Sequence, residues 1–196
     1  MIDAAKAAGV GRIVYTSAPQ ATTSSLVLAP DHKATEEYLA ASGVATTILR
    51  NNWYTENYVD SVKQAAGSGQ IVASAGDGRV ASAPRADFAE AAAVVLLDES
   101  HAGKVYELTG DVAWTFDELA AAAAEVLGRE VSYHGVTPEE HAAMLAGFGL
   151  DEGTVGFVVA LDGNIRDGVL ATATSDLSAL IGRPTTGLVE ALRAAL

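Results

Sequence analysis

The sequence predicts an α/β fold in which parallel strands alternate with helices. Two short runs rich in β-branched residues, Arg12–Ser17 and Val44–Leu49, have the composition of buried strands. A segment with helical spacing lies between them, and another helical pattern begins at Tyr54. Strands that alternate with helices pair in parallel through right-handed crossovers, so we expect these strands to belong to one sheet.

The first half of the chain is expected to contain three helices and two strands. The first helix, Met1–Val10, is alanine-rich and ends at a glycine. The second helix has Asp31 as its N-cap and ends at Gly43. The third helix is indicated by apolar residues that recur every four positions, namely Tyr54, Tyr58 and Val62.

The second half is predicted to mix short strands with further helices. Ile71–Ser74 and Arg79–Ala83 flank a glycine-containing turn, which suits a hairpin or a short pair of loops. Thr115–Glu118 and Thr137–Glu140 are capping boxes that mark helix starts. The other expected elements are a helix at Arg85–Leu97, strands at Lys104–Leu108 and Val131–His134, and a periodic segment at Leu188–Leu196.

Composition excludes several classes of partner and site. Twelve Lys and Arg against 25 Asp and Glu give a formal net charge of −13, and such a chain repels nucleic acid and anionic membrane surfaces. The absence of cysteine excludes disulfides, thiolate metal ligands and cysteine nucleophiles. No apolar stretch is long enough for a membrane span, and no targeting signal is recognised at the N-terminus. We therefore expect a cytoplasmic protein.

The chain begins without the glycine-rich loop that binds phosphate in doubly wound nucleotide folds. In those folds the loop lies between the first strand and the first helix and carries Gly-x-Gly-x-x-Gly. This chain opens on a helix followed by a strand, and no such motif occurs near its beginning. Either the fold is a different one, or the first half of a nucleotide-binding domain is absent.

The candidate site lies where two predicted strands end. Ligands of open α/β sheets bind at the carboxyl ends of the strands, which points to Tyr15–Ser17 and Arg50–Glu56. Asn51 and Asn52 can hydrogen-bond an amide or a ribose, while two aromatic residues, Trp53 and Tyr54, offer flat surfaces to a ring. The alternative is a local turn followed by aromatic core residues.

Two arginines are candidates for either binding or structure. Arg85 follows Pro84 at a predicted helix start, where its guanidinium can reach a phosphate or pair with an acid such as Asp87. Arg50 leaves the end of a strand and can be a buried structural partner of Glu56.

Four stretches of the chain share a pattern with a known family: AAKAAGVGRIVYTSA, ATEEYLAASGVATTILRNNWYTENY, SAGDGRVASAPRADFAEAAAVVL and GKVYELTGDVAWTFDELA. They resemble the NmrA-like atypical short-chain dehydrogenases, and most closely the type 2 NAD(P)H:quinone oxidoreductases of that family. The signature is most specific at Leu49–Asn57. By this resemblance, the chain corresponds to the C-terminal two-thirds of such an enzyme and lacks its N-terminal glycine-rich segment.

The resemblance implies a Rossmann-like, doubly wound parallel sheet with a small α+β substrate lobe. Residues 1–66 and 84–110 would form the C-terminal part of the NAD(P)-binding domain. Residues 67–83 and 111–196 would form the substrate lobe, which is interleaved with that domain.

The resemblance also implies a cofactor and the residues that bind it. The cofactor is expected to be NADPH, with NADH as the alternative, and neither flavin nor metal is expected. The segment that matches Asn51–Glu56 lines the nicotinamide half of the cofactor in related enzymes. The implied cofactor-binding residues are Thr16, Asn51, Asn52, Trp53, Tyr54, Thr55, Glu56 and Arg85.

The chemistry favours a quinone as substrate. Ordinary short-chain dehydrogenases use a Tyr whose pKa is lowered by a Lys four residues later, and no Tyr here has that Lys. A quinone is already a strong hydride acceptor and its hydroquinonate takes a proton from water, so positioning suffices. We take Tyr54, Ser17 and His32 as the candidate catalytic residues, with Lys33 as a further donor. Their structural alternatives are core packing for Tyr54, strand-end capping for Ser17 and a solvated helix surface for Lys33.

The histidines give little support to other chemistries. His32, His101, His134 and His141 form neither His-x-x-x-His nor His-Glu-x-x-His, which disfavours a metal site. A Ser17–His32 pair lacks the Gly-x-Ser-x-Gly elbow of a hydrolase.

Two other functions remain open at this point. One is a redox-sensing regulator of the NmrA type, which binds a dinucleotide without turning it over. The other is a truncated, inactive homologue, because a missing phosphate loop would weaken cofactor binding. Loss of preceding strands would also expose Arg12–Thr16 and the first helix, so we expect a homo-oligomer.

Overall fold

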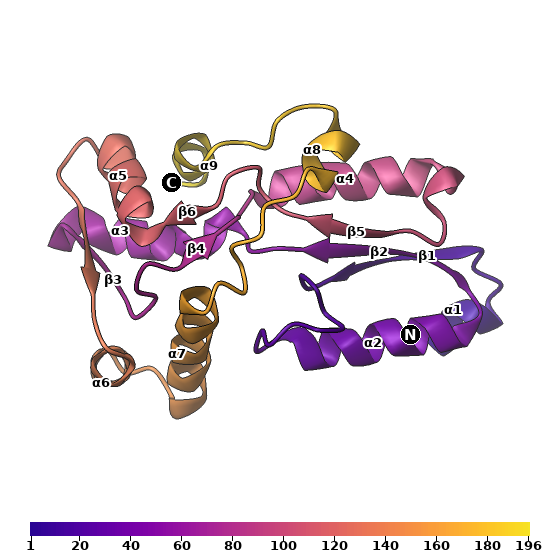
Figure 1. The fold of residues 1–196 in the computed structure, drawn as a ribbon, viewed down its shortest axis with the longest axis horizontal. Coiled ribbons are helices and arrows are strands. Elements are labelled where there is room, and N and C mark those ends of the chain that lie inside the picture. Colours follow the sequence, from indigo (N-terminus) through magenta and orange to yellow (C-terminus); the bar gives the residue numbers. More distant parts are fainter.

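The structure, a computed structural model, describes residues 1–196 without a gap and alternates helices with short strands (Figure 1). In chain order its elements are α1 (Ile2–Ala7), β1 (Arg12–Ser17), α2 (Ala29–Ser42), β2 (Ala45–Asn51), η1 (Thr55–Tyr58), α3 (Val59–Ser68), β3 (Gln70–Ala73), β4 (Arg79–Val80), α4 (Arg85–Leu97), η2 (Glu99–His101), β5 (Val105–Leu108), β6 (Trp114–Thr115), α5 (Phe116–Leu127), β7 (Ser132–Gly135), α6 (Pro138–Gly147), α7 (Glu152–Arg166), α8 (Asp176–Ile181) and α9 (Leu188–Ala195).

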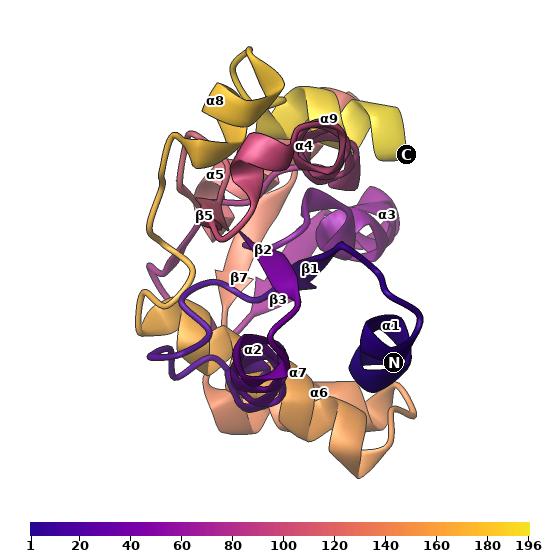
Figure 2. The ribbon, with the colours of Figure 1, turned by 90° about the vertical axis from the view of Figure 1, so that its right-hand side faces the viewer.

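A parallel sheet of three strands forms one end of the molecule. Its order is β1-β2-β5, with Ser17 opposite Arg50 and Arg50 opposite Glu107. Helix α2 covers one face of the sheet, and α4 with α8 covers the other (Figure 2). The predicted α/β fold with parallel pairing is confirmed, because β-branched strands joined by helices can be buried on both faces.

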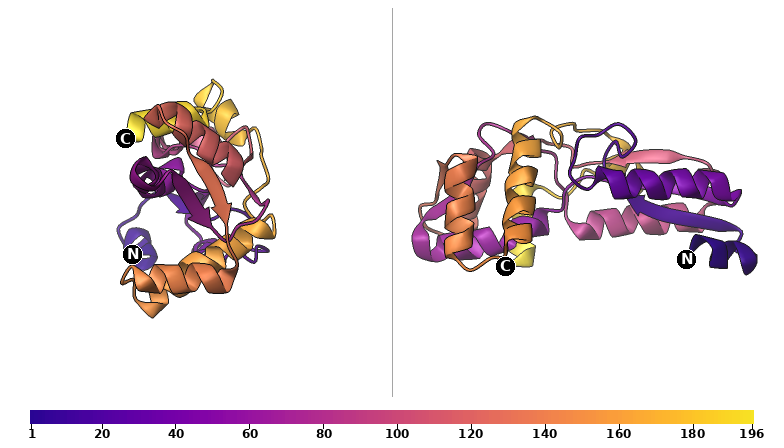
Figure 3. Two further views of the ribbon diagram at one scale, coloured as in Figure 1. Left: turned by 90° about the vertical axis from the view of Figure 1, so that its left-hand side faces the viewer. Right: turned by 90° about the horizontal axis from the view of Figure 1, so that it is seen from below.

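The other end of the molecule contains two small sheets and most of the remaining helices (Figure 3). β3 pairs in parallel with β7, and β4 pairs antiparallel with β6. Of the two alternatives expected for Ile71–Ser74 and Arg79–Ala83, the hairpin is therefore wrong, because β3 and β4 pair with other strands. The segment between β3 and β4 is instead fixed to α7, because the Ser74 N–H donates to the Asp162 carboxylate over 2.6 Å and Gly78 lies directly against the backbone of Ile165.

Two clusters of buried apolar side chains hold these elements together. The smaller one joins β2, α4, β5 and α8 through Leu49, Phe88, Leu108 and Leu177. The larger one lies beneath α3, α5 and α9 and includes an edge-to-face contact between the rings of Tyr58 and Trp114, 4.9 Å apart. Many of its other members are alanines, in keeping with the composition of the chain.

The helix ends agree with the sequence in part. Both capping boxes, at Thr115 and at Thr137, are formed by the side-chain and backbone hydrogen bonds that define this motif. Asp31 is not an N-cap, since α2 already begins at Ala29 and Pro30 occupies its first turn. Proline is tolerated there because the first N–H groups of a helix have no internal acceptor. No helix combines the length and the apolar character that a bilayer crossing requires.

Candidate functional site

The carboxyl ends of β1, β2 and β5 meet at one edge of the parallel sheet. In Figure 1 these ends point toward the junction with the rest of the molecule. The segments that leave this edge begin after Ser17, Asn51 and Leu108. In open α/β sheets this edge is where ligands bind, so side chains on these three segments form the candidate site.

An ion-pair cluster covers the α2 face of this edge. Arg50 donates to Glu36 of α2 over 2.7 Å and to Glu107 of β5 over 2.8 Å. The expectation that Arg50 pairs with Glu56 is wrong. Arg50 points to the α2 face of the sheet, where Glu36 and Glu107 lie. Burial alone would raise the pKa of Glu36, but hydrogen bonds from Arg50 and Ser17 outweigh it and hold that pKa below its ordinary value. The hydrogen bond to Glu36 raises the pKa of Arg50 further.

Ser17 and His32 lie on this same face, and both have hydrogen-bond partners within the chain. The Ser17 hydroxyl donates to Glu36 over 2.6 Å and is buried. His32 Nδ1 lies 2.8 Å from the hydroxyl of Tyr15. Ser17 therefore orients the ion-pair cluster, and His32 packs against the strand that precedes the site.

A second set of predicted residues gathers on the α4 face. Asn51 Nδ2 donates to the Tyr54 hydroxyl over 3.3 Å, and Asn51 Oδ1 is buried without a hydrogen-bond partner. The Arg85 guanidinium lies over the Tyr54 ring, 4.5 Å from its centroid. Both carboxylate oxygens of Glu56 accept from the Arg85 backbone N–H, at 2.9 and 3.1 Å. The four residues thus form one cluster.

Arg85 does not pair with Asp87, which is a correction of the expectation from sequence. The Arg85 side chain reaches Asn57 Oδ1 over 3.1 Å and remains half exposed. Asp87 is buried, and it accepts from Arg183 and from the Thr186 N–H. Asp87 lies in the first turn of α4 and faces the segment that follows α8. The sequence pattern does not reveal this contact, because the two segments are far apart in the chain.

The remaining predicted residues divide between structure and surface. Asn52 is buried, donating to the Leu170 carbonyl over 3.2 Å and accepting from the Trp53 N–H over 2.8 Å. Trp53 is half buried against the larger core cluster. The Thr55 hydroxyl is buried beside that of Ser82. Thr16 is the exposed residue of β1.

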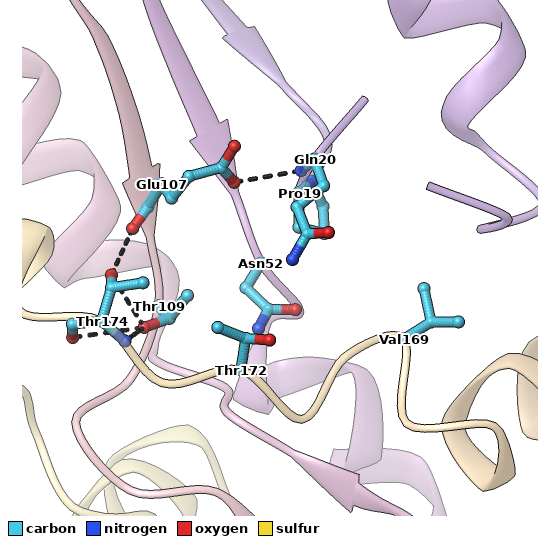
Figure 4. A pocket seen from close by; sticks show the side chains of 8 residues that line it. All are labelled: Pro19, Gln20, Asn52, Glu107, Thr109, Val169, Thr172 and Thr174. Carbon is cyan, nitrogen blue, oxygen red and sulfur yellow. Dashed lines mark hydrogen bonds between the residues drawn. The ribbon is translucent and has the colours of Figure 1, made fainter. Parts of the chain in front are cut away.

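A small cavity of about 30 Å³, lined mostly by polar residues, adjoins Asn52 and the ion-pair cluster (Figure 4). Several of its residues come from segments without a recognisable pattern, so sequence reasoning missed them. Thr109 follows directly after the strand Lys104–Leu108, and the strand-end rule would have found it. The lining residues are Pro19, Gln20, Asn52, Glu107, Thr109, Val169, Thr172 and Thr174.

Comparison with known proteins decides the family. Residues 1–99, half of the chain, match the family described as NAD(P)H-binding. Quinone oxidoreductase 2 of Escherichia coli strain K12 is 46% identical over 192 residues, which is 98% of this chain and 67% of that protein. The chain belongs to the NmrA-like NAD(P)H-binding family. The family expected from the resemblance is thereby confirmed.

Solved structures of two reductases share the fold along nearly the whole chain. The E. coli quinone oxidoreductase complexed with NADPH superposes with a TM-score of 0.94 over 98% of this chain and 68% of that one. Citrobacter sp. triphenylmethane reductase complexed with NADP(H) is 38% identical and also gives 0.94, over 100% of this chain and 69% of that one. The Rossmann-like fold is therefore confirmed. This chain spans about two thirds of the length of these relatives.

Proposed function

We propose that this chain is the nicotinamide-side and substrate-side part of an NAD(P)H-dependent quinone reductase. The observation that carries the proposal is the 46% identity to E. coli quinone oxidoreductase 2 over 98% of this chain. A relative of that similarity supports the same reaction class, and a structure of that relative holds NADPH.

The residues of the α4-face cluster fit a nicotinamide cofactor. The Asn51 Oδ1 atom is a buried acceptor that lacks a donor, and a carboxamide N–H is the kind of group that satisfies it. Trp53 and Tyr54 supply flat aromatic surfaces, and the half-exposed guanidinium of Arg85 supplies a positive charge for an anionic ligand. We assign cofactor contact to Thr16 and to this cluster of Asn51, Tyr54, Glu56 and Arg85, with Trp53 beside it.

Asn52 and Thr55 hold the segment that carries Trp53 and Tyr54 in place. Their side chains fix the segment after β2 to Leu170 and Ser82, so they orient Trp53 and Tyr54. Ser17 acts in the same way through Glu36. Tyr54 and His32 are the side chains that we retain as candidate proton donors.

The reaction consumes one reduced nicotinamide, one quinone and one proton, and it yields the oxidised nicotinamide and a hydroquinone. The bound cofactor supplies the hydride. The chain holds the two rings in contact and excludes water from between them, and the hydroquinonate oxygen takes its proton from Tyr54, His32 or solvent. A quinone needs no strong acid at its oxygen, which agrees with the absence of a Tyr-x-x-x-Lys pair.

The test mixes the purified chain with NADPH and para-benzoquinone and follows the absorbance of the reduced nicotinamide. Oxidation above the rate without protein supports the proposal, and a rate equal to that background contradicts it. NADPH titration by calorimetry is run in parallel. Binding without turnover would favour a dinucleotide-sensing regulator instead.

A further inference from the structure

Gln20 has a backbone conformation that side chains rarely adopt. It is the only residue other than glycine with a positive φ angle, at 47°. In this left-handed region the Cβ atom crowds the following carbonyl, so only glycine, and to a lesser degree asparagine, enters it at low cost. The turn after β1 therefore stores strain at a position next to the candidate site.

A set of hydrogen bonds keeps Gln20 in this conformation. Its N–H donates to Glu107 Oε2 over 3.0 Å, and its carbonyl accepts from the N–H groups of Thr23 and Ser24, both at 2.8 Å. Glu107 is in turn fixed by Arg50. Strained backbone conformations that the surrounding structure enforces occur most often at binding and active sites. There the strain can orient a side chain toward a ligand.

The side chain of Gln20 is directed into the cavity and has no hydrogen-bond partner in the chain. Figure 4 shows its amide pointing into the same space as the amide of Asn52. The hydroxyls of Thr109 and Thr174 bond to one another and to the backbone. The amide of Asn52 bonds to Leu170 and Trp53. Gln20 and Thr172 are both exposed to solvent, so the Gln20 amide and the Thr172 hydroxyl are polar groups of the cavity lining that a ligand can reach.

The size and charge of the cavity define what it can accept. A volume of about 30 Å³ holds one oxygen-sized group and no ring. Glu107 is the one charged residue in its lining, and the cluster of Arg50 with Glu36 and Glu107 carries one positive and two negative charges. A neutral oxygen acceptor therefore fits the cavity better than an anion does.

We propose that Gln20 is a specificity-determining residue that donates a hydrogen bond from its amide to one carbonyl oxygen of a neutral quinone. Thr172 is the second donor to that oxygen, and the charge of Glu107 discriminates against quinones that carry a sulfonate or carboxylate. The assignment deepens the proposed quinone reductase function and rests on it.

The kinetic test compares Gln20→Ala with the unaltered chain. Loss of one neutral hydrogen bond lowers kcat/KM for para-benzoquinone about three- to tenfold and leaves the KM for NADPH unchanged. Gln64→Ala removes an exposed glutamine side chain from α3 and serves as the matched control, with no change expected. Glu107→Gln removes the negative charge that repels anionic quinones. The ratio of kcat/KM for neutral benzoquinone to kcat/KM for sulfonated benzoquinone is therefore expected to fall. Equal kcat/KM for Gln20→Ala and the unaltered chain would overturn the proposal.

Two measurements without turnover separate this proposal from the proposed function. Gln20→Gly is expected to raise Tm by about 2–4 °C relative to Gln20→Ala, because glycine relieves the strain. Hydroquinone binding, followed by saturation-transfer NMR without NADPH, is expected to weaken about three- to tenfold in both variants. If the unaltered chain binds hydroquinone through Gln20 but oxidises no NADPH, the subsite stands and the reductase proposal fails. Unchanged hydroquinone binding in both variants overturns the subsite.

Discussion

The Arg85 guanidinium lies over the ring of Tyr54, 4.5 Å from its centroid, while the Arg85 backbone N–H donates to Glu56. These contacts join the start of α4 to the segment that leaves β2, so two parts of the chain about thirty residues apart act as one surface. A cation held over an aromatic face at an exposed site adds about 0.5–1 kcal/mol to stability. The arrangement leaves the guanidinium N–H groups partly free for an anionic ligand.

Arg85→Ala is expected to weaken NADPH binding much more than it weakens the fold. Removing a charged hydrogen-bond donor costs about 1.5–3 kcal/mol of binding, or roughly tenfold or more in Kd. NMR titration with NADPH measures this, because it detects weak complexes. Arg79→Ala is the control, since Arg79 is exposed to the same degree but pairs with Glu118 at the other end of the molecule. Equal Kd values for the two variants would contradict the assignment of Arg85.

Arg50→Met is expected to destabilise the fold by about 3 kcal/mol, because it leaves two carboxylates near the sheet edge without their partner. The side chains of Arg50 and Glu36 are only 14% and 9% exposed, so solvent replaces little of the lost interaction. Urea unfolding measures the change. Arg193→Met is the control, because Arg193 and Glu125 are 60% and 61% exposed, and such a pair contributes less than about 1 kcal/mol. If Arg50→Met and Arg193→Met lose similar unfolding free energies, the cluster of Arg50, Glu36 and Glu107 stabilises the fold no more than an exposed ion pair does.

The same cluster makes stability depend on pH. Burial raises the pKa of Glu36 but the hydrogen bonds from Arg50 and Ser17 outweigh it, so the pKa in the folded state lies below the ordinary value of 4.5. The unfolded chain therefore binds a proton first, and the contribution of Glu36 is complete above about pH 4.5 and is lost as the pH falls further. Glu36→Gln is expected to flatten this part of the curve of unfolding free energy against pH. An unchanged slope of this curve below about pH 4.5 would contradict the prediction.

How far the sequence predicts this molecule depends on the range of the contacts involved. The strands Arg12–Ser17 and Ala45–Asn51 and the capping boxes follow from residues that are neighbours in the chain. The partners of Arg50 do not, because its long side chain reaches Glu36 and Glu107 by way of the folded sheet. The pattern that places Asn51 and Tyr54 at a strand end is local, and the sequence predicted it correctly.

No sequence pattern predicts helix α7. It contains Gly153, Gly156 and Gly163, residues that disfavour a helix. Contacts with the segment between β3 and β4 offset this, since Asp162 accepts from Ser74 and Arg166 donates to its carbonyl. These partners lie about ninety residues away in sequence. The same limit applies to Gln20 and Thr172, whose meeting in one cavity depends on tertiary structure.

Gly78→Ala is expected to destabilise the fold by more than about 2 kcal/mol, because the added Cβ would collide with the carbonyl oxygen of Ile165. The backbone of Ile165 belongs to α7, and Gly78 lies directly before β4, so the two backbones cannot move apart cheaply. Gly67→Ala is the control, because a Cβ at this helical position in α3 meets nothing within 4 Å. That variant is expected to gain about 0.5–1 kcal/mol from helix propensity. Thermal unfolding of the two variants should therefore shift in opposite directions, and a tolerated Gly78→Ala would refute the close packing of this segment on α7.

Self-association is expected from the free edge of β1. This strand pairs with β2 on one side only, and its row of unpaired backbone groups is a template for another strand. Helix α1 buries no residue, and Val10, just before β1, is 43% exposed. Sedimentation velocity over a range of concentrations is the measurement, and a single monomeric species at every concentration would contradict the expectation.

A lysine on the free edge tests whether β1 is the contact. Thr16→Lys places a charge on the exposed residue of this strand, which disfavours edge-to-edge pairing, and the dimer fraction is expected to fall. Ala34→Lys adds the same charge to the exposed surface of α2 and corrects for the change in net charge. The charge control is needed because a chain at −13 repels its own copies, and any added lysine reduces that repulsion. Ala34→Lys should therefore associate at least as strongly as the unaltered chain, whereas Thr16→Lys should associate less, and equal behaviour of the two variants would place the contact elsewhere.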